Sequence, residues 1–312
     1  MLMMRSWQPL KENDKVRIIA PGAGSPLTKE PNSNWADLEK CCALLASWRL
    51  TPIYSPQIFG EHNSYYNFAN ADDKRCDDFI DALNSDAQVI WPFRGGYGSD
   101  RVIKAIINNN IKEPKPKLII GFSDITNIHN FIFNHWQWPS LHALSMRQLG
   151  LSLVNEQDIA EIRSIIFGEK LETSFSLQPL NNAARVNKII QTKMTGGNLT
   201  LVQTSVGTPW ETPLKNNILL LEDVGELPYR IARIFQQFLA SNYLSSVQAV
   251  ILGDFIPEKD IDIVLLELAK SISIPVLRCK GIGHTSNNRT IPLGTDTILT
   301  LGDNPSMVIK TR

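Results

Sequence analysis

The chain has 312 residues, of which 43% are hydrophobic and 20% charged, a composition typical of a globular protein with one large or two medium domains. Lysine plus arginine and aspartate plus glutamate number 31 each, which argues against nucleic acid or an anionic membrane as the main partner. There is no run of about 18 apolar residues and no apolar stretch in residues 1–10, so we expect a cytoplasmic protein with no membrane span.

The first half of the chain alternates strand and helix patterns. Strands are predicted at 16–20, 89–92 and 118–121, with helices at 35–48, at 102–107 and after the last strand. Such alternation predicts a parallel sheet covered by helices, here a Rossmann-like or flavodoxin-like domain over residues 1–150.

The pattern loosens over residues 151–185, which we interpret as a connection between domains. A second series then predicts a smaller α/β domain over 186–312. Its expected strands and helices lie at 189–194, 218–221, 231–238, 247–252, 261–269, 275–277, 298–301 and 308–310.

The cysteines give no structural framework. Cys41 and Cys42 are adjacent, whereas Cys76 and Cys279 are isolated, so neither a disulfide pattern nor a zinc spacing is present. We expect reduced thiols, and neither a metal ion nor a cofactor.

Ser123 lies where an apolar segment ends and a helical pattern begins. At such a turn the unpaired N–H groups of a helix N-terminus, including that of Asp124, can stabilise negative charge on a substrate oxygen. The nucleophile-elbow pattern Gly-x-Ser-x-Gly is incomplete, because its last position is Ile125. Helix capping is the alternative role for this serine.

A glycine-rich segment at 94–98, Arg-Gly-Gly-Tyr-Gly, also follows a predicted strand and precedes a helix. Its backbone could cradle a phosphate or supply a second oxyanion donor. Neither this segment nor residues 21–24 match Gly-x-Gly-x-x-Gly, so dinucleotide binding is the weaker interpretation.

Five histidines compete for the role of general base. His129 and His135 lie six residues apart on one predicted helix and cannot face one point, and His62 lies in a polar loop. For His142 a structural role is favoured over a substrate contact. Glycines flank His284, which suits a ring presented from a loop, and catalysis and an ordinary surface position both remain open for it.

Glu222 is the first candidate for the acidic partner of a histidine. It ends the predicted strand 218–221, and carboxylates at the carboxyl ends of such strands gather at the ligand crevice of α/β proteins. Asp223 and Glu226 are competitors, with helix N-terminal charge before Pro228 as their alternative role.

These segments together resemble the LD-carboxypeptidase family, the serine peptidases of family S66. The resemblance spans both halves of the chain. It rests on four motifs in order: Arg-Gly-Gly-Tyr-Gly at 94–98, Gly-Phe-Ser-Asp-Ile-Thr at 121–126, Leu-Glu-Asp-Val-Gly-Glu at 221–226 with Pro-Tyr-Arg at 228–230, and Gly-His at 283–284 with Asn-Asn at 287–288 and Pro-Leu-Gly at 292–294.

The resemblance implies a catalytic triad at the domain interface. Ser123 would be the nucleophile, His284 the general base and Glu222 the residue that orients the imidazole, with the N–H groups of Asp124 and Gly96 as oxyanion donors. The family's own elbow, Gly-x-Ser-Asp, needs no further glycine.

The implied substrate is a small peptide, a murein tetrapeptide that loses its terminal D-alanine during peptidoglycan recycling. Arg94 is the candidate for gripping the free carboxylate, with a surface ion pair as its alternative, and Gly95 and Tyr97 complete the expected substrate-binding residues. The rival substrate is the acyl-linked nucleotide antibiotic that microcin immunity peptidases of this family cleave. We expect a homodimer.

One segment departs from the family pattern. Members often carry His-Gly-Pro after the nucleophile helix, and the matching stretch here is His142-Ala143-Leu144. The change bears on the shape of the substrate pocket.

Overall fold

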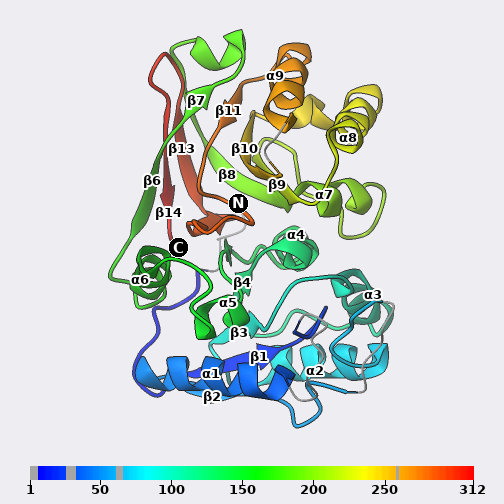
Figure 1. Ribbon diagram of the computed structural model, residues 1–312, viewed down its shortest axis with the longest axis vertical. Helices are drawn as coiled ribbons and strands as arrows, with labels where there is room; N and C mark the ends of the chain where they lie inside the picture. Colours follow the sequence, from blue (N-terminus) through cyan, green and yellow to red (C-terminus); the bar gives the residue numbers. More distant parts are fainter. Residues whose placement is uncertain (1–5, 26–32, 61–65, 258–259) are drawn as a thin grey trace.

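The protein is described by a computed structural model that covers residues 6–25, 33–60, 66–257 and 260–312. The N-terminal half of the chain lies in the lower part of Figure 1, and most of the C-terminal half lies in the upper part. Each is built around its own β-sheet. The expected α/β class with two sheets is therefore confirmed.

The first sheet has six strands in the order β12-β5-β4-β3-β1-β2. They are β1 (Lys15–Ile19), β2 (Thr51–Ile53), β3 (Val89–Pro92), β4 (Leu118–Gly121), β5 (Ser140–His142) and β12 (Ile291–Leu293). The first five pair in parallel, whereas β12 is antiparallel to β5. β12 is not among the expected strands, because a short Ile-Pro-Leu segment with a central proline is a weak strand signal.

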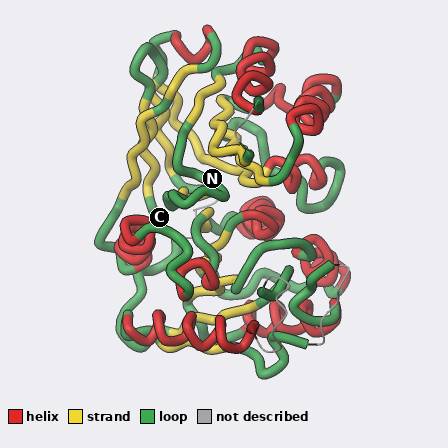
Figure 2. The backbone as a smooth tube through the Cα atoms, in the orientation of Figure 1, coloured by secondary structure: helices red, strands yellow, loops and turns green. Residues whose placement is uncertain are grey.

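Helices cover both faces of this sheet (Figure 2). They are α1 (Ser33–Ser47), α2 (Asp72–Asn84), α3 (Ser99–Asn108), α4 (Thr126–Trp136), α5 (Met146–Gly150) and α6 (Glu156–Ile166). Ile18 packs in the core with α1 and α6, whereas its neighbour Ile19 packs in a second core with α2, α3 and α4. Burial on alternate sides explains why these strands are nearly continuous apolar runs.

The second sheet has eight strands in the order β6-β14-β13-β8-β9-β10-β11-β7. Its strands are β6 (Glu172–Ser176), β7 (Gln178–Pro179), β8 (Ile189–Asn198), β9 (Ile218–Val224), β10 (Ala249–Ile256), β11 (Val276–Arg278), β13 (Asp296–Thr300) and β14 (Ser306–Lys310). Strands β8 to β11 run parallel, and the flanking strands pair antiparallel.

One face of the parallel part packs against α7 (Leu199–Ser205), α8 (Pro228–Ala240) and α9 (Ile261–Ser271). The short 3₁₀ helices η2 (Asn182–Arg185) and η3 (Tyr243–Ser246) complete the elements of this half. No helix in the described ranges has the length and apolar composition that a bilayer crossing requires.

The predicted connection, residues 151–185, is divided between the two sheets. Its helix α6 packs in the N-terminal core through Ile162, Ile165 and Ile166, whereas β6 and β7 belong to the second sheet. The domain boundaries expected at residues 150 and 185 remain a prediction. Strand β6 escapes a pattern search because buried Thr173 replaces an apolar residue in the alternation.

Candidate active site

The residues expected to carry the chemistry lie around one cavity between the two halves. The cavity has a volume of about 390 Å³, and Glu222 lies behind His284 in the protein interior. The cavity is lined by Arg94, Gly95, Gly96, Phe122, Ser123, Ser145, Arg147, Gln148, Val224 and His284. Residues distant in sequence thus share one hollow, because parallel strands present their carboxyl ends at the same edge of a sheet.

Ser123 has a strained backbone. It begins the 3₁₀ helix η1 (Ser123–Ile125) after strand β4 and Phe122, and its φ is +61°. This left-handed conformation costs an L-residue about 1–2 kcal/mol, and strain of this kind concentrates at functional sites. In the described part of the chain, the Ser123 hydroxyl accepts no hydrogen bond from the following helix, so the geometry gives no support to a capping role.

The turn at Ser123 keeps the first glycine of the generic elbow, Gly121, and lacks the last one. A Cβ atom at Gly121 would lie 3.0 Å from the side chain of Ile125, which is fully buried in the core. The close approach therefore requires glycine two residues before the serine. The position of the missing last glycine is filled by a core residue, so the incomplete pattern has a packing explanation.

Glu222 and His284 form a direct pair. The ring Nδ1 of His284 lies 2.8 Å from Glu222 Oε2, so the imidazole donates to the carboxylate. Glu222 is fully buried. Burial alone would raise its pKa, but the adjacent His284, with a smaller effect of His142, lowers the pKa to about 2.

Gly283 makes this pairing possible. Its φ is +122°, and a Cβ there would lie only 2.7 Å from Glu222 Oε2. Glycine alone allows both the backbone angle and the approach. Ser123 and His284 both face the cavity, and they are not hydrogen-bonded to each other among the described residues, which is common before a substrate binds.

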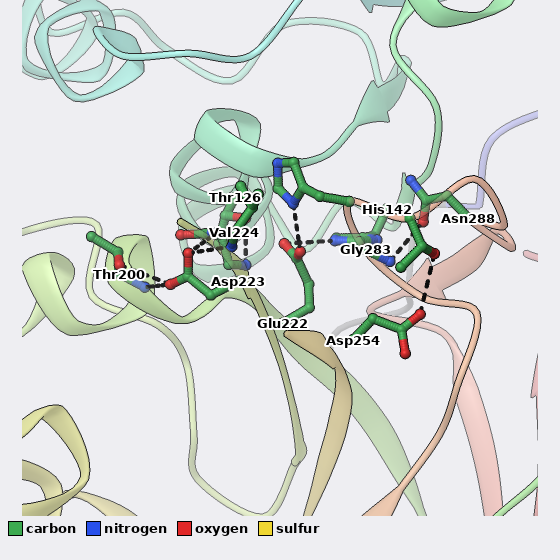
Figure 3. A network of polar contacts seen from close by, with 12 residues as sticks. Thr126, His142, Thr200, Glu222, Asp223, Val224, Asp254, Gly283 and Asn288 are labelled. Carbon is green, nitrogen blue, oxygen red and sulfur yellow. Dashed lines mark hydrogen bonds and ion pairs between the residues drawn. The ribbon is translucent and has the colours of Figure 1, made fainter. Parts of the chain in front are cut away.

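His142 is a second histidine at the same carboxylate (Figure 3). Its Nε2 lies 3.7 Å from Glu222 Oε1, and the ring is fully buried at the end of β5. It packs edge-on against Phe122 at 5.9 Å between ring centres. The structural role favoured for His142 thus takes the form of a contact behind the site, and Ala143 and Leu144 are buried with it.

The other histidines lie apart from this pair. His129 Nε2 lies 2.8 Å from the Gly121 carbonyl oxygen, and burial lowers the pKa of the ring to about 3. His135 Nε2 lies 2.7 Å from the Pro209 carbonyl oxygen. His62 falls outside the described residues.

The neighbours of Glu222 point elsewhere. The Asp223 carboxylate accepts hydrogen bonds from the Thr200 backbone N–H at 2.9 Å and from the Thr200 hydroxyl at 2.8 Å, at the N-terminus of α7 (Figure 3). Glu226 lies 3.7 Å from Arg230. Asp223 therefore contacts the start of α7 and not the helix that begins at Pro228, and Glu222 alone of the three reaches His284.

The side chain of Asp124 supports the glycine-rich loop. It is buried and accepts hydrogen bonds from the Ser99 N–H at 2.9 Å and the Ser99 hydroxyl at 3.0 Å, at the start of α3. Burial raises its pKa to about 6. The backbone N–H of Asp124 has no acceptor among the described residues, and a Cβ at Gly95 would lie 3.3 Å from this nitrogen and 3.2 Å from Ser123 Oγ.

Gly96 lines the same cavity as Ser123. Its φ is +98°, and a Cβ there would lie 2.4 Å from the Ala23 Cβ. The backbone N–H of Gly96 also has no acceptor in the described part of the chain. Two unpaired N–H groups are therefore found near Ser123: that of Gly96, which lines the cavity, and that of Asp124, the residue after the serine.

Two guanidinium groups line the cavity. Arg94 donates to the Gly24 carbonyl at 3.0 Å rather than forming a surface ion pair, and burial followed by the charge of Arg147 lowers its pKa. Arg147 donates to Asp37 at 2.8 Å. Tyr97 is 41% exposed and packs against Phe68 at 5.5 Å between ring centres, away from the residues that line the cavity.

Three residues that line the cavity were not predicted from the sequence: Arg147, Ser145 and Gln148. All three follow strand β5, at the same sheet edge as Ser123 and Gly95. Ser145 and Gln148 form a capping box at the start of α5. The Ser-x-x-Gln spacing was the available signal for this helix start, and the position after a parallel strand was the signal for the site.

A strained serine and a histidine–carboxylate pair at one cavity define a serine hydrolase whose site is shared by two domains. The chain belongs to the LD-carboxypeptidase family. Residues 16–143 match the family's N-terminal domain and residues 191–299 its C-terminal domain.

Individual relatives agree with this assignment. The chain is 32% identical over 293 residues to a Rickettsia conorii protein named among the carboxypeptidases, covering 91% of this chain and 87% of that protein. It is 28% identical over 315 residues to the murein tetrapeptide carboxypeptidase of Pseudomonas aeruginosa, covering 95% of each. The microcin C7 self-immunity protein has the same fold, with a TM-score of 0.78 at 18% identity, covering 99% of this chain and 98% of that one.

Proposed function

We propose that the protein is a cytoplasmic LD-carboxypeptidase that removes the terminal D-alanine from murein tetrapeptides in peptidoglycan recycling. One observation carries the proposal: His284, paired with the buried Glu222, faces the same cavity as the strained Ser123. The similarity to the murein tetrapeptide carboxypeptidase of Pseudomonas aeruginosa supports the substrate class.

In the proposed reaction Ser123 Oγ attacks the carbonyl carbon before the terminal D-alanine, and His284 takes the serine proton. Glu222 holds the other ring nitrogen and stabilises the imidazolium. The ring then gives its proton to the leaving amine, and D-alanine departs from an acyl-enzyme. Water, deprotonated by His284, hydrolyses the ester and restores Ser123.

The N–H groups of Asp124 and Gly96 are the proposed oxyanion donors. Asp124 follows Ser123 in the chain and Gly96 lines the same cavity as Ser123. Neither N–H has another acceptor among the described residues, so both are available for the charge that develops on the carbonyl oxygen. Donors fixed in advance of the reaction stabilise this charge without reorganisation. The strand, the strained Ser123 and the following helix then act as a nucleophile elbow.

Arg94 is the proposed ligand of the substrate's free carboxylate. It lines the cavity beside Gly95, and its described contact is to a carbonyl oxygen rather than to an acid, so its charge remains available. Arg147 adds positive charge nearby, although Asp37 offsets part of it. A planar guanidinium can hold both carboxylate oxygens at once.

An immunity-type peptidase that cleaves an acyl-linked nucleotide is the second candidate, favoured by the fold shared with the microcin C7 self-immunity protein. The two substrates differ in one chemical feature, because only the murein peptide ends in a free carboxylate next to the scissile bond.

The test compares a murein tetrapeptide with the same peptide amidated at its C-terminus. The wild type is expected to release alanine from the free peptide and to reject the amide, as followed by mass spectrometry. Arg94→Ala is expected to lose about 10–100-fold in kcat/KM on the free peptide, the equivalent of a lost charge-assisted hydrogen bond. Arg49→Ala, at an exposed ion pair with Glu12, is the control. Equal cleavage of both peptides by the wild type would defeat the proposal.

A further inference from the structure

The loop that carries His284 needs support from outside itself. It runs from Gly281 to Asn288 between β11 and β12 and contains two glycines in the left-handed region, Gly281 at φ +81° and Gly283 at φ +122°. Glycines remove side-chain bulk but leave the backbone free to adopt other angles. A base held by such a loop keeps its place only if other groups fix the loop.

Asp254 makes contacts on both sides of His284 in the sequence. Its Oδ2 accepts hydrogen bonds from the Gly281 N–H at 2.8 Å and from the Thr285 hydroxyl at 3.2 Å. Its own N–H donates to the Ile282 carbonyl at 2.8 Å. Asp254 is only 3% exposed, so these contacts form away from bulk water.

A β-bulge aims Asp254 at this loop. Leu252 pairs with Leu221 and Phe255 with Asp223, so two residues of β10, Gly253 and Asp254, lie opposite the single residue Glu222 of β9. Bulges redirect side chains and are frequent beside active sites. Glu222 and Asp254 therefore share one local irregularity. In Figure 3 both side chains lie below the loop that carries Gly283.

We infer that Asp254 is a positioning residue that holds the 281–285 loop so that His284 Nδ1–H meets Glu222. The effect of Asp254 on catalysis depends on the proposed function. Its effect on the geometry of the His284–Glu222 pair does not, because this pair exists without substrate.

The surroundings of Asp254 allow a conservative test. Arg278 lies 3.9 Å from Asp254 Oδ1, the oxygen that does not contact the loop, and it also lies 3.5 Å from Asp262, whose side chain is 56% exposed. Asp262→Asn thus removes an acid beside the same arginine without touching the loop, and it is the matched control for Asp254→Asn.

A second support keeps the loop folded when Asp254 is changed. Asp158 of α6 accepts from the Asn288 N–H at 2.7 Å, and the Asn288 side chain accepts from the Gly283 N–H at 2.9 Å. Both contacts remain in Asp254→Asn. Thr285→Val gives an independent variant that removes the hydroxyl that contacts both Asp254 and the Asn287 carbonyl oxygen, with Thr285→Ser as its conservative rescue.

The first measurement is proton NMR of the substrate-free protein. It detects the downfield Nδ1–H signal of His284, which is assigned by its loss in His284→Gln. The signal is expected to shift or broaden in Asp254→Asn and Thr285→Val, and to be unchanged in Asp262→Asn and Thr285→Ser. An unchanged signal in both test variants would overturn the inference.

The second measurement is peptidase kinetics. Because a displacement of about 1 Å can cost about 10²-fold in rate, Asp254→Asn is expected to lose tenfold to 10²-fold in kcat with little change in KM. A loss confined to KM, or kcat within about twofold of wild type, would contradict the positioning role. Failure of the proposed function would appear separately, as turnover that persists in Ser123→Ala while the NMR result stands.

Discussion

Glu222→Gln and Asp223→Asn make a paired test of which carboxylate serves His284. The two residues are adjacent on β9 and both are buried, yet Glu222 contacts His284 at 2.8 Å and Asp223 contacts Thr200. Each amide matches the shape of the acid that it replaces. The pair therefore changes charge and acceptor capacity at two neighbouring positions with different partners.

The two changes are expected to affect different properties, catalysis in Glu222→Gln and stability in Asp223→Asn. Glu222→Gln leaves the His284 imidazolium without its counter-charge, and the equivalent acid-to-amide change in a serine protease triad lowers kcat by about 10⁴-fold, or about 5 kcal/mol. Asp223→Asn weakens a helix-end cap with two donors, worth about 1–2 kcal/mol of unfolding free energy. Activity should be lost in the first variant and stability in the second.

The assay is D-alanine release from a murein tetrapeptide, with urea unfolding measured on the same samples. We expect Asp223→Asn to keep kcat within a few-fold of wild type at a temperature where it is folded. A loss of kcat in folded Asp223→Asn that equals or exceeds that of Glu222→Gln would refute the assignment of the acid.

Ser123→Gly should unfold with about 1 kcal/mol more free energy than Ser123→Ala, because glycine relieves the left-handed strain; equal stability in urea would contradict the strain. Gly96→Ala should lower kcat by at least about 10²-fold through a displaced oxyanion donor. The control is Gly207→Ala, which should keep full activity because Gly207 has a φ of +77° and no atom near the added Cβ. Similar kinetics for the two variants would contradict a role for Gly96 in the site. The pKa of folded Glu222, about 2, lies below its ordinary value of 4.5, so the stability it adds is complete above about pH 4.5 and is lost as the pH falls towards 2. In urea unfolding the difference between wild type and Glu222→Gln should therefore shrink by roughly 3 kcal/mol over this range, and a constant difference would oppose the assigned shift.

The sequence predicted the parts of the site that depend on local pattern. The strand before Ser123, the glycine loop at 94–98 and the end of the strand at Glu222 are each visible as apolar runs that stop at a glycine, serine or acid. Parallel topology then brings the strand ends together. Nothing in the local sequence separates Glu222 from Asp223, because the choice depends on which strand neighbour each side chain faces.

The parts that escaped prediction depend on long-range packing. Strand β12 joins the N-terminal sheet although it lies about 150 residues from β5 in the sequence, which no local signal can reveal. His142 meets Glu222 only because β5 lies between β4 and β12 in the N-terminal sheet and its end reaches the carboxylate on β9. The support of the His284 loop by Asp254 requires a bulge, and a one-residue irregularity in strand pairing leaves no trace in an apolar run.

The central claim is that Ser123 carries an acyl group while D-alanine departs. The direct measurement is mass spectrometry of the protein during turnover of a murein tetrapeptide, quenched in acid and digested. The account predicts a tripeptide ester on the peptide that contains Ser123, free D-alanine in solution, and neither in Ser123→Ala. Release of D-alanine by Ser123→Ala at a rate close to that of the wild type, with no ester on the protein, would contradict it.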